Sequence, residues 1–433
     1  MAFFENKYLI TLGVQGEPNS LALWNLQRRL MEESALMDYT VNQVRVDPHT
    51  TGSSTFQFIT VGNNATLTVW RYDTEAAKAG HSGEAVQALH PILVQPPRQL
   101  LDLHFLSVAF TDYLPAPVGT YYAVVGVSDG SLVPVVIPLN HPELSSPEEE
   151  EEKPRFVGDA HMRSRISGGE VGAISIAHDA IVIGCSDGVV AYYPIVGSQI
   201  SPQDPDMVVT HRLESAVVAI SMDELNKQGL IGTEAGCIHY VNFQEMVPPI
   251  KLVSSNNMNQ DAIHHLKFDF ANPRVFLAAC GQRTEQLKLY TGENCDQVMN
   301  FEANFEEEGY VVFVIGHPQF SKLKSGSGRG PLSKKQVRLV GFSNGYIKVL
   351  SITTLAVKHS FRVPLNREAG EVLTCGQYSQ NNKNFAFGTN HGTLFVGNLV
   401  QAKRMDANYA KIVNVGKCNN FETADQTQKR HTK

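Results

Sequence analysis

The most regular feature of the chain is an apolar run that ends in glycine and is followed, after a polar turn, by a second apolar run. Four segments show it most clearly: 184–195 (GCSDGVVAYYPI), 232–243 (GTEAGCIHYVNF), 341–352 (GFSNGYIKVLSI) and 388–399 (GTNHGTLFVGNL). Asp-Gly and Asn-Gly pairs tolerate the positive φ angles of a tight hairpin, and the alternation of apolar and polar residues that follows is typical of a strand. Each segment therefore predicts two strands joined by a tight turn.

Weaker copies of the pattern begin at Gly13, Gly62, Gly126 and Gly281, so the chain carries eight predicted hairpins. A further strand is predicted before most of them, at 41–46, 100–110, 171–177, 216–222, 262–270, 311–317 and 372–379. A repeat of about 45 residues with three or four short strands is typical of a β-propeller blade, whose faces are buried by its neighbours. The sequence therefore predicts an all-β fold, a β-propeller of seven or eight four-stranded blades with long inter-strand insertions.

The order of these elements resembles the WD repeat, in which the last core strand ends in Trp-Asp. The closest strand ends here are Leu23-Trp24-Asn25 and Val69-Trp70-Arg71. No repeat has Trp-Asp itself, and no Gly-His pair opens a repeat as in a typical WD protein. These departures argue against the Asp–His–Ser/Thr–Trp hydrogen-bond network of typical WD blades, and we expect the blades to depend more on apolar packing.

Within that superfamily, the divergent repeats and long insertions look most like the large WD-repeat proteins of the ciliary axoneme. Residues 7–26 (KYLITLGVQGEPNSLALWNL) are similar to a repeat of those proteins. The resemblance implies a non-catalytic scaffold that docks partner proteins on its rim and loops. It further implies a structural component of the axoneme or of another microtubule-associated assembly, located in the cytoplasm, in the cilium or flagellum or on the cytoskeleton.

Two other functions remain open at this stage: a cytosolic adaptor, such as a ubiquitin-ligase or trafficking scaffold, and a propeller hydrolase. A hydrolase needs titratable groups that converge on the central channel. The predicted inner strands are largely apolar, and Asp102, His104, His264 and Asp269 are scattered. We therefore predict no catalytic residue, no cofactor and no enzyme activity.

The predicted domain organisation is a propeller over residues 1–405 and a C-terminal segment over 406–433. Met1–Phe4 has the pattern of the end of an inner strand, so an unpaired edge would remain in the first blade. Either the segment Tyr409–Val415 closes the ring, or sequence upstream of Met1 is missing and the chain is one propeller of a longer protein or complex. The last residues are polar and predict disorder.

The overall charge limits the classes of partner. Of the 433 residues, 18% are charged and the net charge is −7, so nothing global favours nucleic acid. The apolar runs are shorter than the roughly 20 residues of a membrane span. The predicted partners are therefore proteins, with tubulin or other axonemal proteins first, and neither nucleic acid nor membrane.

Two charged segments interrupt the repeats. The acidic loop 145–155 (SSPEEEEEKPR) predicts a solvated loop between blades. The basic loop 322–335 (KLKSGSGRGPLSKK) is the candidate partner-binding segment, since its positive charges would suit an acidic partner such as the tails of tubulin; the alternative is a linker without a partner. Its charged residues are Lys322, Lys324, Arg329, Lys334 and Lys335.

The cysteines and histidines give little sign of a metal centre. The six cysteines include no Cys-x-x-Cys motif, so reduced thiols are favoured over disulfides or zinc. The one histidine pair, His264-His265, is predicted in a strand, where adjacent side chains point to opposite faces. The sequence therefore predicts no metal site.

Overall fold

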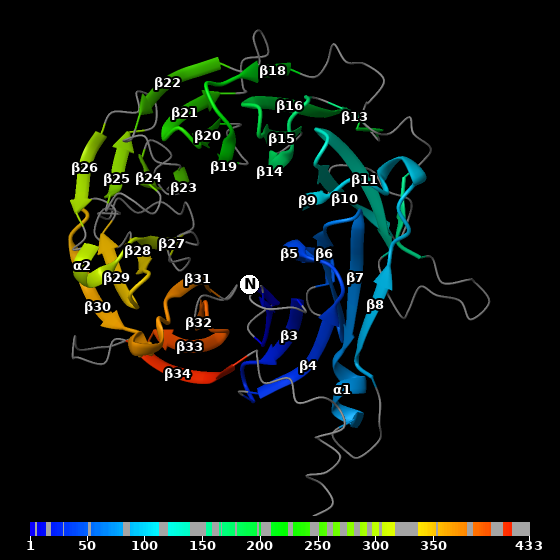
Figure 1. The fold of residues 1–433 in the computed structure, drawn as a ribbon, viewed down its shortest axis with the longest axis horizontal. Coiled ribbons are helices and arrows are strands. Elements are labelled where there is room, and N and C mark those ends of the chain that lie inside the picture. The colour runs from blue at the N-terminus through cyan, green and yellow to red at the C-terminus, as the bar shows by residue number, and fades with distance from the viewer. Residues whose placement is uncertain are drawn as a thin grey trace, which may run out of the picture.

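The structure, a computed structural model, is a ring of small antiparallel sheets around a central axis (Figure 1). Eight sheets follow one another in chain order, six with four strands and two with five. The described residues are 1–417 apart from 5–6, 14–18, 29, 51–52, 81–86, 112–119, 139–152, 158–163, 166, 178–179, 197–198, 201–208, 224–227, 243–250, 258–262, 269–274, 281–285, 292–296, 303–304, 317–336, 352–353, 379–383, 400 and 401–409.

The first four blades take up roughly the first half of the chain. Blade 1 is formed by β1 (Ala2–Phe4), β2 (Tyr8–Gly13), β3 (Asn19–Asn25) and β4 (Leu30–Met37). Blade 2 is formed by β5 (Val41–Val46), β6 (Thr55–Gly62), β7 (Thr66–Asp73) and β8 (Leu89–Leu93). Blade 3 is formed by β9 (Phe105–Thr111), β10 (Thr120–Val127), β11 (Ser131–Pro138), β12 (Arg155–Phe156) and β13 (Ser164–Arg165). Blade 4 is formed by β14 (Val171–Ala177), β15 (Ala180–Cys185), β16 (Val189–Val196), β17 (Gln199–Ile200) and β18 (Val209–Arg212).

The second four blades have four strands each. Blade 5 is formed by β19 (Val217–Asp223), β20 (Gln228–Thr233), β21 (Cys237–Asn242) and β22 (Lys251–Asn257). Blade 6 is formed by β23 (Ile263–Phe268), β24 (Val275–Cys280), β25 (Gln286–Thr291) and β26 (Gln297–Glu302). Blade 7 is formed by β27 (Val311–Gly316), β28 (Val337–Phe342), β29 (Tyr346–Ser351) and β30 (Val357–Arg362). Blade 8 is formed by β31 (Leu373–Tyr378), β32 (Asn384–Thr389), β33 (Thr393–Leu399) and β34 (Ala410–Lys417).

In the part of the chain that the structure describes, helices are few and short. They are α1 (Thr74–Gly80), α2 (Phe305–Glu308) and the 3-10 turns η1 (Pro48–Thr50), η2 (Arg98–Leu100) and η7 (Arg367–Ala369). Figure 1 shows α1 at the outer margin of blade 2, away from the axis. Among the helices of the described residues, none has the length and hydropathy needed to cross a membrane.

All eight predicted hairpins are present, and each supplies the two middle strands of one sheet. The turn glycines adopt the positive φ that the Asp-Gly and Asn-Gly pairs predict, with values from 71° to 88°. They are Gly130, Gly188, Gly236, Gly345 and Gly392. The hairpin at Gly62 turns without glycine, because Asn64 and Ala65 take φ of 55° and 52°. The predicted inner strands are also present, as β5, β9, β14, β19, β23, β27 and β31.

Among the strands whose burial is described, the middle strands of the blades are the most buried. Every residue of β11 and β15 is buried, because each blade is covered by a neighbour on both faces. The outer strand β30 is mostly exposed, and most residues of β4 are exposed or half-buried. One-sided alternation therefore describes the outer strands, whereas the middle strands are apolar on both faces.

The core consists of apolar clusters that lie between neighbouring blades. One cluster joins Phe4 and Tyr8 of blade 1 to Phe56 of blade 2, with the Phe4 and Phe56 rings stacked at 4.0 Å between centroids. Another joins blades 7 and 8 through Phe313 and Phe387, stacked at 5.4 Å. Blade-to-blade packing, rather than one central core, therefore holds the ring together.

The ring closes between blades 8 and 1 through side-chain packing. Phe3, Leu9 and Trp24 of blade 1 share a cluster with Ala386 and Leu394 of blade 8. The predicted closing segment Tyr409–Val415 overlaps β34, which pairs with β33 as the outermost strand of blade 8. Within the described residues, blade 1 draws its four strands from Ala2–Met37 and blade 8 from Leu373–Lys417, so the two ends share no sheet.

The glycine near the end of β15 makes room for the next blade. A Cβ added at Gly184 would meet the side chains of Val217 and Ile220 on β19, with Val217 Cβ at 2.7 Å. We therefore expect Gly184→Ala to lower the free energy of unfolding by about 1–3 kcal/mol, as overpacking does. Urea denaturation tests this, with Gly168→Ala as the control, because nothing lies within 4 Å of a Cβ there. Equal stability of the two variants would contradict the packing role.

Candidate functional site

The residues singled out from the sequence lie largely outside the described part of the chain. The basic loop with Lys322, Lys324, Arg329, Lys334 and Lys335 falls within the undescribed segment 317–336, between β27 and β28. The glutamates of the acidic loop lie within 139–152, which is also outside the described residues. His264 and His265 lie in β23, and only their backbone is described. The role of the basic loop therefore stays a prediction.

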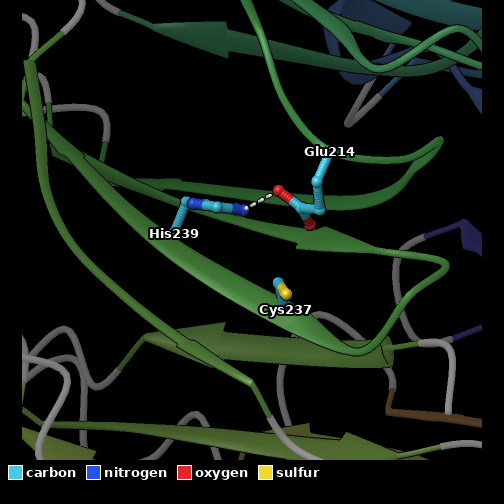
Figure 2. A group of neighbouring side chains, drawn as sticks. All are labelled: Glu214, Cys237 and His239. Carbon is cyan, nitrogen blue, oxygen red and sulfur yellow. Dashed lines mark hydrogen bonds and ion pairs between the residues drawn. The ribbon is translucent and has the colours of Figure 1, made fainter. Parts of the chain in front are cut away.

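The structure instead brings together Glu214, Cys237 and His239 in blade 5 (Figure 2). Their ligand-type atoms lie within 4.8 Å of one another. Nε2 of His239 is 2.9 Å from Oε2 of Glu214, and the second carboxylate oxygen accepts the Thr233 hydroxyl at 2.7 Å. The Cys237 thiol lies beside this carboxylate. One carboxylate thus accepts hydrogen bonds from Thr233 and His239 and has the thiol as a neighbour.

Strand geometry explains why these residues meet. Cys237 and His239 are two residues apart on β21, so their side chains share a face of the sheet. The turn at Gly236 leads directly into that strand. Glu214 lies in the connection between β18 of blade 4 and β19 of blade 5, and its carboxylate faces His239 on β21 (Figure 2). The sequence signal that could have revealed the cluster is the Cys-x-His at the start of a strand.

The electrostatics favour a neutral imidazole and a neutral thiol beside an ionised carboxylate. Burial raises the pKa of Glu214, but the hydrogen bonds from Thr233 and its own backbone, with His239 nearby, outweigh this and leave the pKa below its ordinary value. Burial lowers the pKa of His239, and the carboxylate offsets this in part. Burial, together with Glu214, raises the pKa of Cys237 to about 11.

Blade 8 repeats the carboxylate part of this arrangement. Thr389 donates its hydroxyl to Glu371 at 2.9 Å, as Thr233 does to Glu214. The backbone N–H of Thr393 donates to the Thr389 hydroxyl at 3.1 Å, as that of Cys237 does to Thr233 at the same distance. The glutamate before an inner strand therefore has a structural role, because its hydrogen bond joins the connection between two blades to the hairpin of the second of those blades.

Other blades use different residues at these positions. In blade 7, Glu308 forms a largely buried ion pair with Lys348, which like His239 is the third residue after the turn glycine. In blade 2, the Tyr39 hydroxyl hydrogen-bonds Thr60 at 2.9 Å and Thr68 at 3.0 Å. A polar link between the blade connection and the hairpin is thus a recurrent feature of this propeller.

Two blades also keep part of the network that the sequence argued against. Trp24 donates its indole N–H to Thr11 at 2.9 Å, and Trp70 donates to Thr60 at 2.8 Å. These are Thr–Trp bonds between the two middle strands of blades 1 and 2. The expectation that the blades depend on apolar packing is therefore incomplete, because a threonine on the neighbouring strand accepts the indole N–H even where Asp and His are missing.

The carboxylate of Glu371 makes the stability of blade 8 depend on pH. Burial raises the pKa of Glu371, but hydrogen bonds from the Asn366 backbone and the Thr389 hydroxyl, with His391 nearby, outweigh it, so the folded-state pKa lies below the ordinary value. The unfolded chain then binds more protons, so this stability is complete above the ordinary pKa and is lost as pH falls through the folded-state pKa.

We expect Glu371→Gln to lower the free energy of unfolding by about 1.5–3 kcal/mol at neutral pH and to flatten its fall in acid, because the hydrogen bonds would no longer have a charged acceptor. Urea unfolding from neutral pH into the acid range measures both effects. Glu368→Gln is the matched control, since Glu368 is an exposed glutamate three residues away. The same acid dependence in wild type and Glu371→Gln would contradict the assignment.

Comparisons with known proteins agree on the fold. No protein-family model matches the chain. WD repeat-containing protein 90 of Xenopus tropicalis is 23% identical over 141 residues, which are 33% of this chain and 7% of that protein. Sqt1 of Chaetomium thermophilum matches at a TM-score of 0.64 and 11% identity, over 90% of this chain and 92% of that chain. The same protein, bound to the N-terminus of ribosomal protein L10, matches at 0.62 and 11% identity, over 90% and 93%.

A further solved structure of the same kind is the C-terminal WD40 domain of Sif2, with a TM-score of 0.52 and 12% identity over 79% of this chain and 78% of that chain. These likenesses confirm the predicted β-propeller and its WD-repeat type of fold. At such identities they establish the fold alone.

Proposed function

We propose that the chain is a non-catalytic scaffold that docks partner proteins on its propeller, as a structural component of the ciliary axoneme or of another microtubule-associated assembly. The observation that carries the scaffold proposal is the propeller itself, in which a recurrent polar network has a structural role. Glu371 and Glu308 tie blade connections to hairpins and are buried there. A catalytic role is therefore not needed to explain these titratable groups.

Two comparisons support protein binding and a WD-repeat context. Sqt1, which has a similar fold, is bound in its structure to the N-terminus of ribosomal protein L10. The curated relative is itself a WD repeat-containing protein. The axonemal part of the proposal depends on the resemblance of residues 7–26 to axonemal WD repeats and on the charge of the basic loop.

The strand ends that flank the basic loop lie at the opposite end of blade 7 from the turn between β28 and β29. These strand ends, Gly316 and Val337, lie opposite the turn at Gly345, because the three strands are antiparallel. Exposed carboxylates occur at the turns and blade connections of that other side, among them Glu170, Glu234, Glu306 and Glu307.

Microtubule co-sedimentation tests the proposal. We expect the wild-type chain to pellet with microtubules, less so as salt rises, because screening weakens contacts between exposed charges. A variant with alanine at Lys322, Lys324, Arg329, Lys334 and Lys335 should lose most of this binding.

A second variant serves as the matched control, with the same change of charge elsewhere on the surface. It replaces five exposed basic residues with alanine, namely Lys78, Arg98, Lys153, Lys358 and Arg362. We expect this variant to bind like wild type. Folded wild-type protein that stays in the supernatant would overturn the tubulin proposal, and equal loss in both variants would overturn the role of the basic loop.

A further inference from the structure

The recurrent network explains Glu214 and Thr233, but it does not explain Cys237 and His239. In blade 8 the residues after the turn that correspond to them are Thr393 and Phe395. In blade 7 they are Tyr346 and Lys348. The structural link therefore forms without a thiol and without an imidazole, so blade 5 has two metal-binding side chains that its packing does not require.

We propose that Glu214, Cys237 and His239 form a binding site for Zn²⁺, with water as the fourth ligand. A thiolate, an imidazole and a carboxylate are the three donor types that zinc selects in proteins, and three protein ligands leave a position open. The proposal is independent of the scaffold function, because it concerns one blade and not the docking surface.

The geometry of the three donors is close to what zinc needs. Tetrahedral zinc holds sulfur at about 2.3 Å and nitrogen or oxygen at about 2.0–2.2 Å. The donor atoms here already lie within 4.8 Å of one another, and Nε2 of His239 is 2.9 Å from Oε2 of Glu214 (Figure 2). A cation placed between them needs only small side-chain shifts. The Glu214 side chain is 39% exposed, so it has room to move and gives solvent access to the site.

The charges of the three groups also match a divalent cation. A bound Glu214 carboxylate and a bound Cys237 thiolate each carry one negative charge, and the imidazole of His239 is neutral. Zinc displaces the thiol proton to solvent, as metal binding to cysteine does. Two negative ligands then balance the two positive charges of the ion, so the site carries no net charge.

The histidine is arranged to be a ligand through Nε2. An ionised carboxylate accepts hydrogen bonds and donates none, so Nε2 carries the imidazole proton when it faces Glu214. Nδ1 is buried and has no hydrogen-bond partner among the described residues. When zinc takes the place of the Nε2 proton, the neutral ring carries its proton on Nδ1, and no net charge is added.

Cobalt(II) substitution tests the site in the full chain, because a cysteine thiolate bound to Co²⁺ gives a charge-transfer band in the near ultraviolet. We expect wild-type protein to show this band with one equivalent of Co²⁺ and to lose it when Zn²⁺ is added. Cys237→Ser should abolish the band. Cys375→Ser, which removes another free and partly buried thiol, should leave it unchanged.

A second variant separates metal binding from folding. Loss of a residue that only hydrogen-bonds a metal ligand weakens metal binding by up to roughly 100-fold. His239 is a ligand itself, so we expect His239→Gln to weaken Zn²⁺ binding by more than this. Zinc should raise the thermal midpoint of wild type and of Cys375→Ser, and should leave Cys237→Ser unchanged, because a ligand stabilises only a state that binds it. Folded wild type without the cobalt band, or a band that survives in Cys237→Ser, would overturn the proposal.

Discussion

Trp24→Ala is expected to lower the free energy of unfolding by about 3–5 kcal/mol, the usual cost of truncating a large buried aromatic side chain. Trp24 is 3% exposed and packs against Ala386 and Leu394, across the junction of blades 1 and 8. The chain does not connect these blades directly, and within the described residues they share no sheet. Their junction therefore depends on this packing.

Trp70→Ala is the matched control for Trp24→Ala. Trp70 has the same kind of hydrogen bond to a threonine and is 4% exposed, but it packs between blades 1 and 2, which are consecutive in the chain. We expect a similar loss of global stability from both variants, measured by guanidinium denaturation.

Hydrogen exchange should distinguish the two variants. In Trp24→Ala we expect faster exchange in β1–β3 together with β32 and β33, because the junction opens locally before the ring unfolds. In Trp70→Ala the faster exchange should be confined to blades 1 and 2. Unchanged protection of β32 and β33 in Trp24→Ala would show that the ring is closed by other contacts.

The sequence predicts the hairpins because their chemistry is local. An Asp-Gly or Asn-Gly pair specifies a positive φ by itself, and Gly188 and Gly345 adopt it at the predicted places. The glycines at the strand ends are equally clear in the sequence, but the sequence does not show why glycine is needed there. Gly184 is small because Val217 of the next blade approaches it, and that contact exists only once the sheets are stacked.

The inner strands show a further feature that local patterns do not reveal. Near the start of β5, β14, β19, β23, β27 and β31, the pairing register shifts by one residue, as in a β-bulge. In β19 the shift lies between Val217 and Ala219, and Val218 is 39% exposed. An apolar strand therefore presents a residue to solvent, which the periodicity of AVVAISM does not predict.

The candidate site was missed for a similar reason. A Cys-x-x-Cys motif does not describe this site, because two ligands on one face of a strand need a spacing of two, as in Cys237 and His239. The third residue, Glu214, comes from the connection before β19 and is brought to β21 by the stacking of strands within the blade. The two strand residues could have been found from sequence, but the glutamate could not.

The buried pair of Glu308 and Lys348 offers the second large effect. The exposed fractions of their side chains are 9% and 13%, so each charge has lost most of its water. Lys348 also lies over the Phe342 ring, with its nitrogen 5.4 Å from the centroid. We expect Glu308→Leu alone to lower the free energy of unfolding by about 3–5 kcal/mol, because it leaves a buried charge without its partner.

The double variant Glu308→Leu, Lys348→Met should recover most of that loss, since neither charge then needs to be desolvated. Urea denaturation of both single variants and the double variant measures the coupling. The exposed pair of Glu75 and Lys78, with side chains 65% and 56% exposed, is the control, and its coupling should be about 0–1 kcal/mol. A double variant less stable than either single variant would mean that the pair itself stabilises blade 7. Recovery would mean that the ion pair contributes little to the free energy of unfolding. Its role would then be to position α2 and the connection into β27 against the hairpin of β28 and β29.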